Sequence, residues 1–282
     1  MKYFFNLLRM KQWYKNIIIF VPLVFSLNLF NKGILLEYII GFISMCAVSS
    51  SYYIVNDIID RERDKLHPEK KERPLAAGKI SLGAAVTCCL IMLALALLTA
   101  SYINYKFFLT IGGMFVYIVA YSLFLKEEAF LDMILIAFNF VLRTLAGIFI
   151  LNVNFISPWI ISCTFFLAML IVAGKRKAEL MTLKQRAGEH RKVLEEYTPQ
   201  VLEGIMYISA SFLLVAFSIY AVLSEREGLL ISLPVVMYSF ARYFLAVQKN
   251  SVEARNPEFF LKDKKLMTSI LVWIMIVVIA LY

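Results

Sequence analysis

Long apolar stretches separated by short polar segments dominate this chain of 282 residues. A membrane-spanning helix needs roughly 20 mostly apolar residues. Nine stretches approach that length, at about 16–31, 34–55, 80–102, 106–125, 131–152, 157–174, 201–223, 229–247 and 266–282. Because lipid cannot satisfy backbone hydrogen-bonding groups, we expect these stretches to be helices. The pattern predicts an all-α polytopic membrane protein with about nine transmembrane helices, the first of them short and kinked at Pro22.

The composition agrees with a lipid environment. Hydrophobic residues make up 61% of the chain, charged residues only 17%, and the mean hydropathy is +0.75. Soluble domains usually carry about 25% charged residues. These values exclude a cytosolic globular enzyme, a disordered chain and a secreted disulfide-built protein. The four cysteines lie inside apolar stretches, and neither histidine has a metal-ligand partner at a useful spacing. We expect one integral-membrane domain over residues 1–282.

The distribution of basic residues predicts an orientation in the membrane. With the N-terminus in the cytoplasm, the cytoplasmic segments are the N-terminal arm, 56–79, 126–130, 175–200 and 248–265. They carry 24 of the 29 Lys and Arg residues, and the opposite loops carry three. This excess predicts a cytoplasmic N-terminus and an outer C-terminus. The net charge of +9 then suits anionic lipid or an anionic substrate rather than nucleic acid.

A first polar cluster follows the second apolar stretch. If the helix continues, Asp57, Asp60, Asp64 and Asn56 lie within one arc of about 100°. Carboxylates that share a face repel one another unless a cation compensates them. Hard oxygen ligands suit Mg²⁺, which takes the rest of its coordination shell from water and substrate phosphates. The alternative is a solvated acidic helix end.

Basic residues accompany this cluster. Lys70 and Arg73 in the following loop can meet phosphate oxygens, Arg73 through a bidentate fork. The alternative for such lysines is contact with lipid headgroups. Tyr121 and Lys126 end the fourth apolar stretch, where they either join the site or anchor the helix at the membrane interface. The cluster therefore offers both carboxylates and phosphate-binding cations.

Two further clusters follow. Asp132, Asn139 and Arg143 share one face of the fifth stretch, and Arg143 lies about 16 Å along the axis from Asp132. An Arg at that depth requires a polar cavity or a carboxylate, so the alternative is a structural ion pair. Lys175, Arg176 and Glu179 group on a continued sixth helix as an anion site, or simply begin a basic loop.

Several motifs resemble a known family. Asn56-Asp57-x-x-Asp60-x-x-x-Asp64 at a membrane helix end resembles the first aspartate motif of the UbiA superfamily of intramembrane transferases. Longer strings resemble its decaprenyl-phosphate phosphoribosyltransferase branch: His67-Pro68-x-Lys70-x-x-Arg73-Pro74-x-Ala76-x-Gly78, Lys11-Gln12-Trp13-x-Lys15-Asn16, Tyr121-Ser122-x-x-Leu125-Lys126 with Asp132, Leu142-Arg143-x-x-Ala146-Gly147, Gly174-Lys175-Arg176-x-x-Glu179, and Pro257-Glu258 before Asp263. The Lys175-Arg176-x-x-Glu179 segment departs from the prenyltransferases of the superfamily, which carry a second aspartate motif there.

The resemblance implies a reaction and roles for these residues. The donor would be phosphoribosyl pyrophosphate and the acceptor a polyprenyl phosphate, and the polyprenyl phosphoribose that forms can lead toward cell-wall arabinose. Asp57, Asp60 and Asp64 would hold Mg²⁺ on the diphosphate. Donor phosphates would meet the cations Lys126, Arg143, Lys175 and Arg176. Lys15 would meet the acceptor phosphate, and Asp132 and Glu179 would hold ribose hydroxyls or orient the cations.

Two alternatives stay open. A prenyltransferase that moves an isoprenoid from its diphosphate to an aromatic or other small acceptor shares the Mg²⁺-assisted departure of diphosphate. A transporter with a carboxylate ion site is less consistent with the sequence, because the acidic cluster lies at a helix end rather than at mid-membrane. The sequence leaves open the length of the acceptor lipid and whether the chain forms a homo-oligomer.

Overall fold

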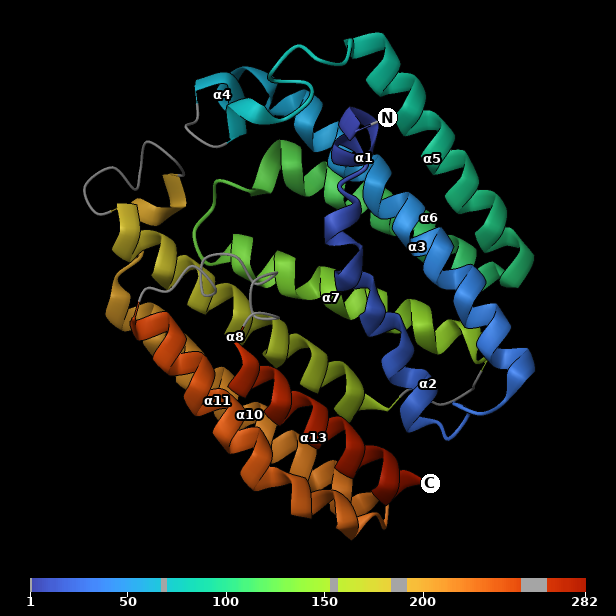
Figure 1. The fold of residues 1–282 in the computed structure, drawn as a ribbon, viewed down its shortest axis with the longest axis vertical. Coiled ribbons are helices and arrows are strands. Elements are labelled where there is room, and N and C mark those ends of the chain that lie inside the picture. Colours follow the sequence, from blue (N-terminus) through green and yellow to red (C-terminus); the bar gives the residue numbers. More distant parts are fainter. Residues whose placement is uncertain (1, 67–69, 153–156, 184–191, 250–262) are drawn as a thin grey trace. The chain divides into compact units, whose positions relative to one another are not determined.

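The structure, a computed structural model, describes residues 2–66, 70–152, 157–183, 192–249 and 263–282 (Figure 1). Over these residues the chain forms helices joined by turns, and no strand occurs among them. The predicted all-α class is therefore confirmed. His67, Pro68, Pro257 and Glu258, which contributed to the motifs above, lie outside the described residues.

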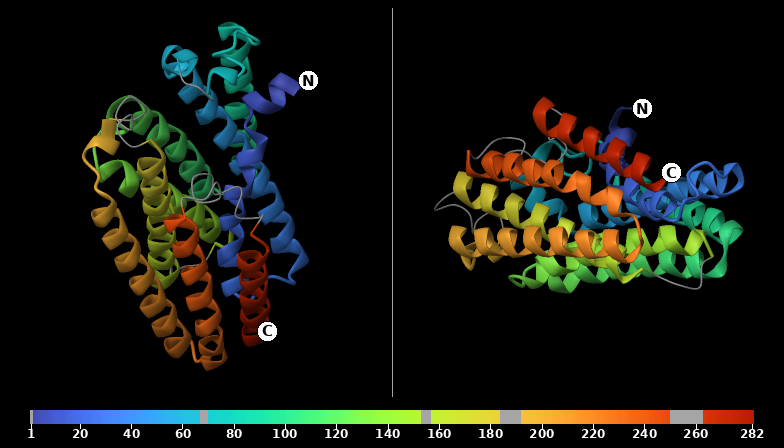
Figure 2. Two further views of the ribbon diagram at one scale, coloured as in Figure 1. Left: turned by 60° about the vertical axis from the view of Figure 1, so that its left-hand side comes forward. Right: turned by 90° about the horizontal axis from the view of Figure 1, so that it is seen from below.

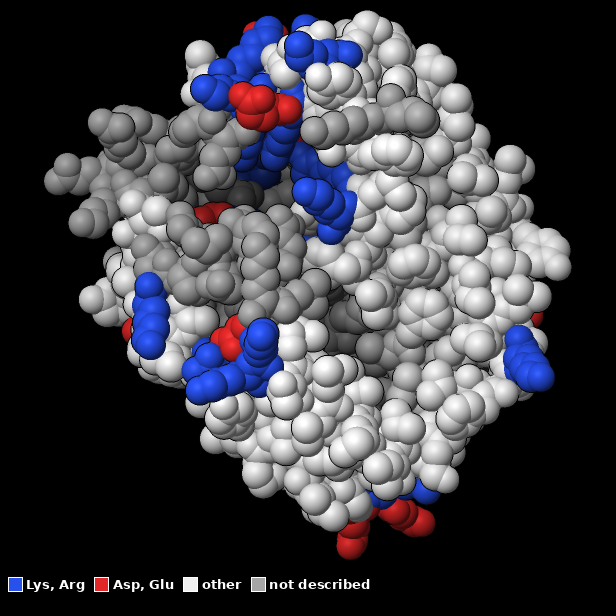
Figure 3. All heavy atoms as spheres, viewed as in Figure 1, with Lys and Arg blue, Asp and Glu red and all other residues white. Residues whose placement is uncertain are grey.

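Among the described residues, eight helical segments are long and apolar enough to cross a membrane. They are α3 (Lys32–Ile59), α5 (Leu82–Ile103), α6 (Tyr105–Ala120) with the π-helix η3 (Tyr121–Leu125), α7 (Leu131–Ile150), α8 (Pro158–Leu183), α10 (Pro199–Leu223), η6 (Glu227–Ser232) with α11 (Leu233–Gln248), and α13 (Lys264–Leu281). Each corresponds to a predicted stretch. On the face shown in Figure 3, most of the described surface is uncharged, and Lys and Arg gather in patches.

The first predicted stretch, 16–31, is not one continuous helix. The short helix α1 (Lys2–Leu7) precedes a 3₁₀ helix, η1 (Met10–Phe20), and a short α-helix, α2 (Val21–Phe25), in whose first turn Pro22 lies. Proline suits that position because it lacks the backbone N–H that a helix start leaves unpaired. The predicted interruption is therefore present, and the segment is broken rather than simply kinked.

The chain forms two compact units. The first contains Met1–Lys126 and Leu142–Ile156, and the second contains Glu127–Val141 and Ser157–Tyr282. Helix α7 belongs to both, its start in the second unit and its end in the first. The prediction of a single domain over residues 1–282 stays a prediction.

In the first unit, α3 packs against α5, α6 and η1. The buried side chains at this junction include Ile19, Tyr38 and Phe107. Gly147 on α7 permits a close approach of two backbones, because a Cβ atom there would lie 2.2 Å from the carbonyl oxygen of Ile19. The Tyr38 hydroxyl donates a hydrogen bond of 2.7 Å to the carbonyl of Gly147. These contacts hold η1 against α7, and α7 against α3, the helix that carries Asp57.

In the second unit, α8 packs along α10, and α11 packs along α13 (Figures 1 and 2). Its core includes Leu170, Leu202 and Met206. Gly174 on α8 leaves room for Tyr243, because a Cβ atom there would lie 2.1 Å from the Tyr243 hydroxyl oxygen. The glycine that begins the Gly174-Lys175-Arg176 segment therefore allows α11 to lie close to α8.

Candidate active site

The acidic cluster lies where α3 ends. Helix α3 stops at Ile59, Asp60 takes the C-cap position, and a separate helix, α4 (Arg61–Leu66), begins after it. The expectation of an uninterrupted helix through Asp64 is therefore wrong, because the backbone turns at Asp60. Asp57 and Asp64 are nevertheless both buried, at 2% and 3% exposure.

Arg73 holds these two buried carboxylates together. Its Nη1 atom donates to Asp57 Oδ1 at 3.1 Å and to Asp64 Oδ2 at 2.6 Å. The turn after the 3₁₀ helix η2 (Lys70–Glu72) positions it, with backbone bonds from Ala77 to Arg73 and from Lys79 to Pro74. One nitrogen reaches an oxygen of each carboxylate, so the two acids converge on a position that a cation fills.

Arg9 is a second cation on Asp57, and the sequence analysis missed it. Its guanidinium donates to Asp57 Oδ1 and lies 4.9 Å from the centre of the Tyr53 ring. Its backbone has φ 49°, in the left-handed region, between α1 and η1. The neighbouring Leu8 carbonyl accepts a hydrogen bond of 2.8 Å from Ser50 Oγ. The only available signal was its place in the basic N-terminal arm.

Burial and pairing affect the protonation of this cluster. Burial raises the pKa of the Asp64 carboxyl above its usual range, against the opposing effect of Arg73. Burial disfavours the charged form of Arg9, but the Asp57 carboxylate outweighs it and raises the pKa of Arg9 above its usual value. The Asp64 carboxylate thus depends on nearby positive charge to stay ionised.

Asp60 has a different partner. Lys126 Nζ donates to Asp60 Oδ1 at 2.5 Å, and about a fifth of each side chain is exposed. Lys126 follows the π-helix η3, whose first residue is Tyr121. Such π-helical turns are rare and occur often at functional sites. Asp60 and Lys126, which are 66 positions apart, therefore form a direct ion pair, and their predicted roles at Mg²⁺ and at a donor phosphate stay predictions.

The donor set of Asp57 and Asp64 fits a magnesium ion that has few protein ligands. Among the described residues, no three His, Cys, Asp or Glu side chains come close enough together to hold a metal ion. Mg²⁺ is commonly held by one or two carboxylates, with water and substrate phosphates completing its octahedron. Asp57 and Asp64 provide such a pair. Coordination by all three aspartates stays a prediction.

Arg143 lies in a buried polar cluster of the first unit. It is 1% exposed, its Nε donates to Asn16 Oδ1 at 3.0 Å, and its Nη2 donates to the Tyr52 hydroxyl at 2.6 Å. Asn16 Oδ1 also accepts from Ser49 Oγ at 3.1 Å. Asn16 from η1 and Tyr52 from α3 therefore provide the polar surroundings that an Arg at this depth requires.

The second unit contains an independent network around Asp132, which is fully buried at the start of α7. Arg176 donates to Asp132 Oδ2 through Nε at 3.2 Å and Nη2 at 2.9 Å, and through Nη1 to Glu179 at 2.8 Å. Lys175 Nζ lies 3.8 Å from Glu179. The Lys175 side chain is 38% exposed and that of Arg176 only 3%, so Lys175 is the more accessible of the two predicted phosphate ligands.

Tyr197 completes this network and was also missed. Its hydroxyl donates to Asp132 Oδ1 at 2.5 Å and accepts from the backbone N–H of Phe130 at 2.9 Å. Phe130 has φ 62°, a left-handed conformation just before α7. Burial and the bond to Asp132 raise the pKa of Tyr197 above its usual value, so the hydroxyl stays a neutral donor. No motif in the sequence marks this residue.

The other predicted residues occupy varied positions. Asn56 lies on α3 one residue before Asp57 and is half-buried, as are Lys70 in η2 and Tyr121. Lys15, in η1, lies 5.9 Å from the centre of the Tyr14 ring. The roles given to these residues stay predictions.

Three comparisons bear on this arrangement. A model of the family described as the UbiA prenyltransferase family matches residues 18–279. The decaprenyl-phosphate phosphoribosyltransferase of Corynebacterium glutamicum is 29% identical over 98% of this chain and 85% of its own length. The protein of the same name from Mycolicibacterium smegmatis is 27% identical over 97% of this chain and 91% of its own length.

The fold has solved counterparts. The structure of a UbiA homologue from Archaeoglobus fulgidus bound to GPP and Mg²⁺ matches with a TM-score of 0.75 and 22% identity, over 98% of this chain and 99% of that one. The same homologue bound to DMAPP and Mg²⁺ matches with a TM-score of 0.76. This likeness shows the fold.

Proposed function

The chain belongs to the UbiA prenyltransferase family, and we propose that it transfers a 5-phosphoribosyl group from phosphoribosyl pyrophosphate to a polyprenyl phosphate, with release of pyrophosphate. It is a multi-pass membrane enzyme. The two relatives named decaprenyl-phosphate phosphoribosyltransferase support this choice of reaction. The acceptor class follows from the same names.

One observation carries the proposal: carboxylates and cations alternate at a single helix end. Asp57 and Asp64 pair with Arg9 and Arg73, and Asp60 pairs with Lys126. A magnesium diphosphate presents both charges at once, because the metal suits the carboxylates and the phosphate oxygens suit guanidinium and ammonium groups. The site therefore matches such a donor in charge.

Residues of this chain would prepare the donor for reaction. Asp57 and Asp64, with Asp60, would hold Mg²⁺, which when bound supplies charge stabilisation for the departing diphosphate. Arg9, Arg73 and Lys126 would exchange their carboxylate partners for diphosphate oxygens. As the bond between ribose C1 and the leaving oxygen breaks, positive charge develops on the sugar, and nearby carboxylates favour it.

The second network offers an accessible cation to an anionic phosphate group. Lys175 is the exposed cation for a phosphate that carries no metal, and Asp132 with Glu179 fixes the orientation of Arg176. The acceptor phosphate is already anionic, so it needs positioning rather than a general base. Lys15 and Arg143 are the cations proposed for positioning it or the donor phosphates. No histidine, serine or cysteine is required as a nucleophile.

Prenyl transfer is the second candidate, favoured by the family description and by the prenyl diphosphates named with the solved homologue. It would use the same magnesium diphosphate site. The Lys175-Arg176-x-x-Glu179 segment favours phosphoribosyl transfer. Two cations at this position suit a metal-free phosphate better than they suit a second metal-bound diphosphate. We also propose that the N-terminus and the acidic cluster face the cytoplasm, from the excess of basic residues on that side.

A transfer assay with purified protein in detergent tests the reaction. Labelled phosphoribosyl pyrophosphate is offered with a polyprenyl phosphate, and in parallel a labelled prenyl diphosphate is offered with aromatic acids. We expect label in the lipid phase from the first pair, and its loss on removal of Mg²⁺ with a chelator. Asp60→Asn should abolish this transfer, whereas Lys71→Ala, an exposed charge change in η2, should retain it. Product from the second pair alone would reject the proposal.

A further inference from the structure

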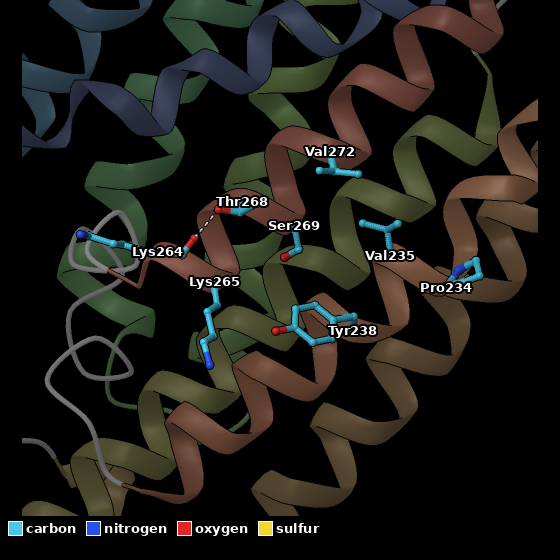
Figure 4. Close-up of a pocket in the computed structure, with 8 residues that line it drawn as sticks. All are labelled: Pro234, Val235, Tyr238, Lys264, Lys265, Thr268, Ser269 and Val272. Carbon is cyan, nitrogen blue, oxygen red and sulfur yellow. Dashed lines mark hydrogen bonds between the residues drawn. The ribbon is translucent and has the colours of Figure 1, made fainter.

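A groove of about 570 Å³ lies along the seam between α11 and α13 in the second unit (Figure 4). Its volume falls within the range of small-ligand sites, roughly 300–1,000 Å³. Pro234, Val235 and Val272 line its apolar part, and Tyr238, Lys264 and Lys265 line its polar part. None of these residues belongs to the proposed catalytic machinery.

Two side-chain contacts hold the walls of the groove together. Ser239 Oγ on α11 donates to Ser269 Oγ on α13 at 2.9 Å. Arg242 Nη2 donates to Asp263 Oδ2 at 2.7 Å, and Asp263 caps α13 by accepting from two backbone N–H groups. Since both helices are joined at two levels, the groove is a fixed feature of their packing and not a gap between independent segments.

The polar part of the groove is positively charged. Lys264 and Lys265 are both exposed, and the acidic neighbour, Asp263, is already paired with Arg242. Tyr238 is 48% exposed, and Figure 4 shows its ring beside α13 with the hydroxyl directed to the same side as the Lys265 amine. The Lys265 ammonium and the Tyr238 hydroxyl can both donate hydrogen bonds to a phosphate, and the ammonium matches its negative charge.

The apolar part continues along helices that are long and apolar enough to span a membrane. Lys265 and Val272 are seven residues apart on α13, so the groove extends about 10 Å from its charged end. That length suits the upper part of an acyl chain. Charge at one end and branched apolar side chains beyond it match the layout of a lipid that stands in one leaflet.

We propose that this groove binds one anionic glycerophospholipid, with its phosphate at Lys265 and Tyr238 and an acyl chain against Val235 and Val272. Each basic residue near a membrane surface contributes about 1 kcal/mol to the binding of anionic lipid. The open 570 Å³ accommodates a phosphate headgroup and the first part of one chain. This inference does not depend on the proposed reaction.

The test compares the retention of phosphatidylglycerol and phosphatidylcholine by the purified protein in native mass spectrometry, without donor or acceptor. We expect phosphatidylglycerol to be retained preferentially. Lys265→Ala should weaken its binding about fivefold, the factor that corresponds to about 1 kcal/mol. Lys265→Arg should retain it, and Val272→Trp, which fills the apolar part, should weaken the retention of both lipids.

Lys249→Ala is the matched control, because it removes one exposed charge at the end of α11 that does not line the groove. An equal loss of phosphatidylglycerol from Lys249→Ala and Lys265→Ala would show a diffuse surface charge effect and reject the site. Equal retention of the two lipids would reject the anionic headgroup. Displacement of phosphatidylglycerol by equimolar polyprenyl phosphate in a Lys265-dependent manner would assign the groove to that lipid instead.

Discussion

Replacement of Arg73 tests the electrostatic account of the acidic cluster. In Arg73→Ala, Asp64 loses the cation that lies 2.6 Å away, whereas Asp57 keeps Arg9. Removing one partner of a fully buried ion pair costs about 3–5 kcal/mol, and exposed pairs contribute about 0–1 kcal/mol. The side chain of Asp64 is 4% exposed, whereas the side chain of Arg73 is 25% exposed. We therefore expect a loss of about 2 kcal/mol in the free energy of unfolding, between those limits.

The measurement is reversible unfolding of the purified protein in mixed detergent micelles, without magnesium or substrate. Lys71→Ala is the control, because it removes an exposed positive charge two positions away in the same loop. Arg73→Lys should recover part of the loss, since an ammonium group keeps the charge but not the planar fork. Adding Asp64→Asn to Arg73→Ala should remove most of the penalty, because no buried charge is then left without its partner. If Arg73→Ala costs no more than Lys71→Ala, buried ion pairing does not stabilise this loop.

Three further results are expected. Tyr197→Phe should cost about 1–3 kcal/mol, because Asp132 and the Phe130 N–H both lose a buried partner, whereas Tyr207→Phe on the exposed face of α10 should cost less. Gly147→Ala should cost about 2 kcal/mol or more, because its Cβ meets the Ile19 carbonyl, whereas Gly113→Ala, with nothing within 4 Å, should be neutral or stabilising in the same unfolding assay. Although burial alone would raise it, the Leu266 N–H and Arg242 hold the pKa of Asp263 below its usual range. Its contribution to stability is therefore complete at neutral pH and is lost as the pH falls below ~4, and Asp263→Asn should abolish that acid-side loss when unfolding is followed against pH.

The apolar pattern predicted most of the fold because lipid imposes a simple rule on it. A spanning segment has to be helical and about 20 residues long, so length and hydropathy locate it within a few residues. The N-terminal stretch 16–31 is the exception. Its η1 and α2 helices are set by Pro22 and by contacts such as Gly147 with Ile19, which come from distant parts of the chain. Such close approaches are not visible in local hydropathy.

Helical spacing predicted which acids belong together but not which cations pair with them. Asp57 and Asp64 come together as their helical spacing suggested, but the backbone turns at Asp60 and the shared bonds to Arg73 hold them there. Arg9 and Tyr197 reach their partners through tertiary contacts, across 48 and 65 positions of sequence. Pairing across such distances depends on backbone turns with left-handed residues, and these turns have no sequence signature here.

Because every acid in these networks is paired with a cation, the cost of binding depends on whether diphosphate and metal bind separately or together. A diphosphate that took Arg9 and Arg73 from Asp57 and Asp64 would leave two buried carboxylates without compensation, which is costly. A magnesium ion that took the carboxylates would release arginines that are about a fifth to a quarter exposed, and water can solvate them. When metal and diphosphate arrive together, each charge exchanges one partner for another. The substrate-free pairing would therefore favour the magnesium complex of the proposed donor over either component alone, and it would keep the site ordered until that complex binds.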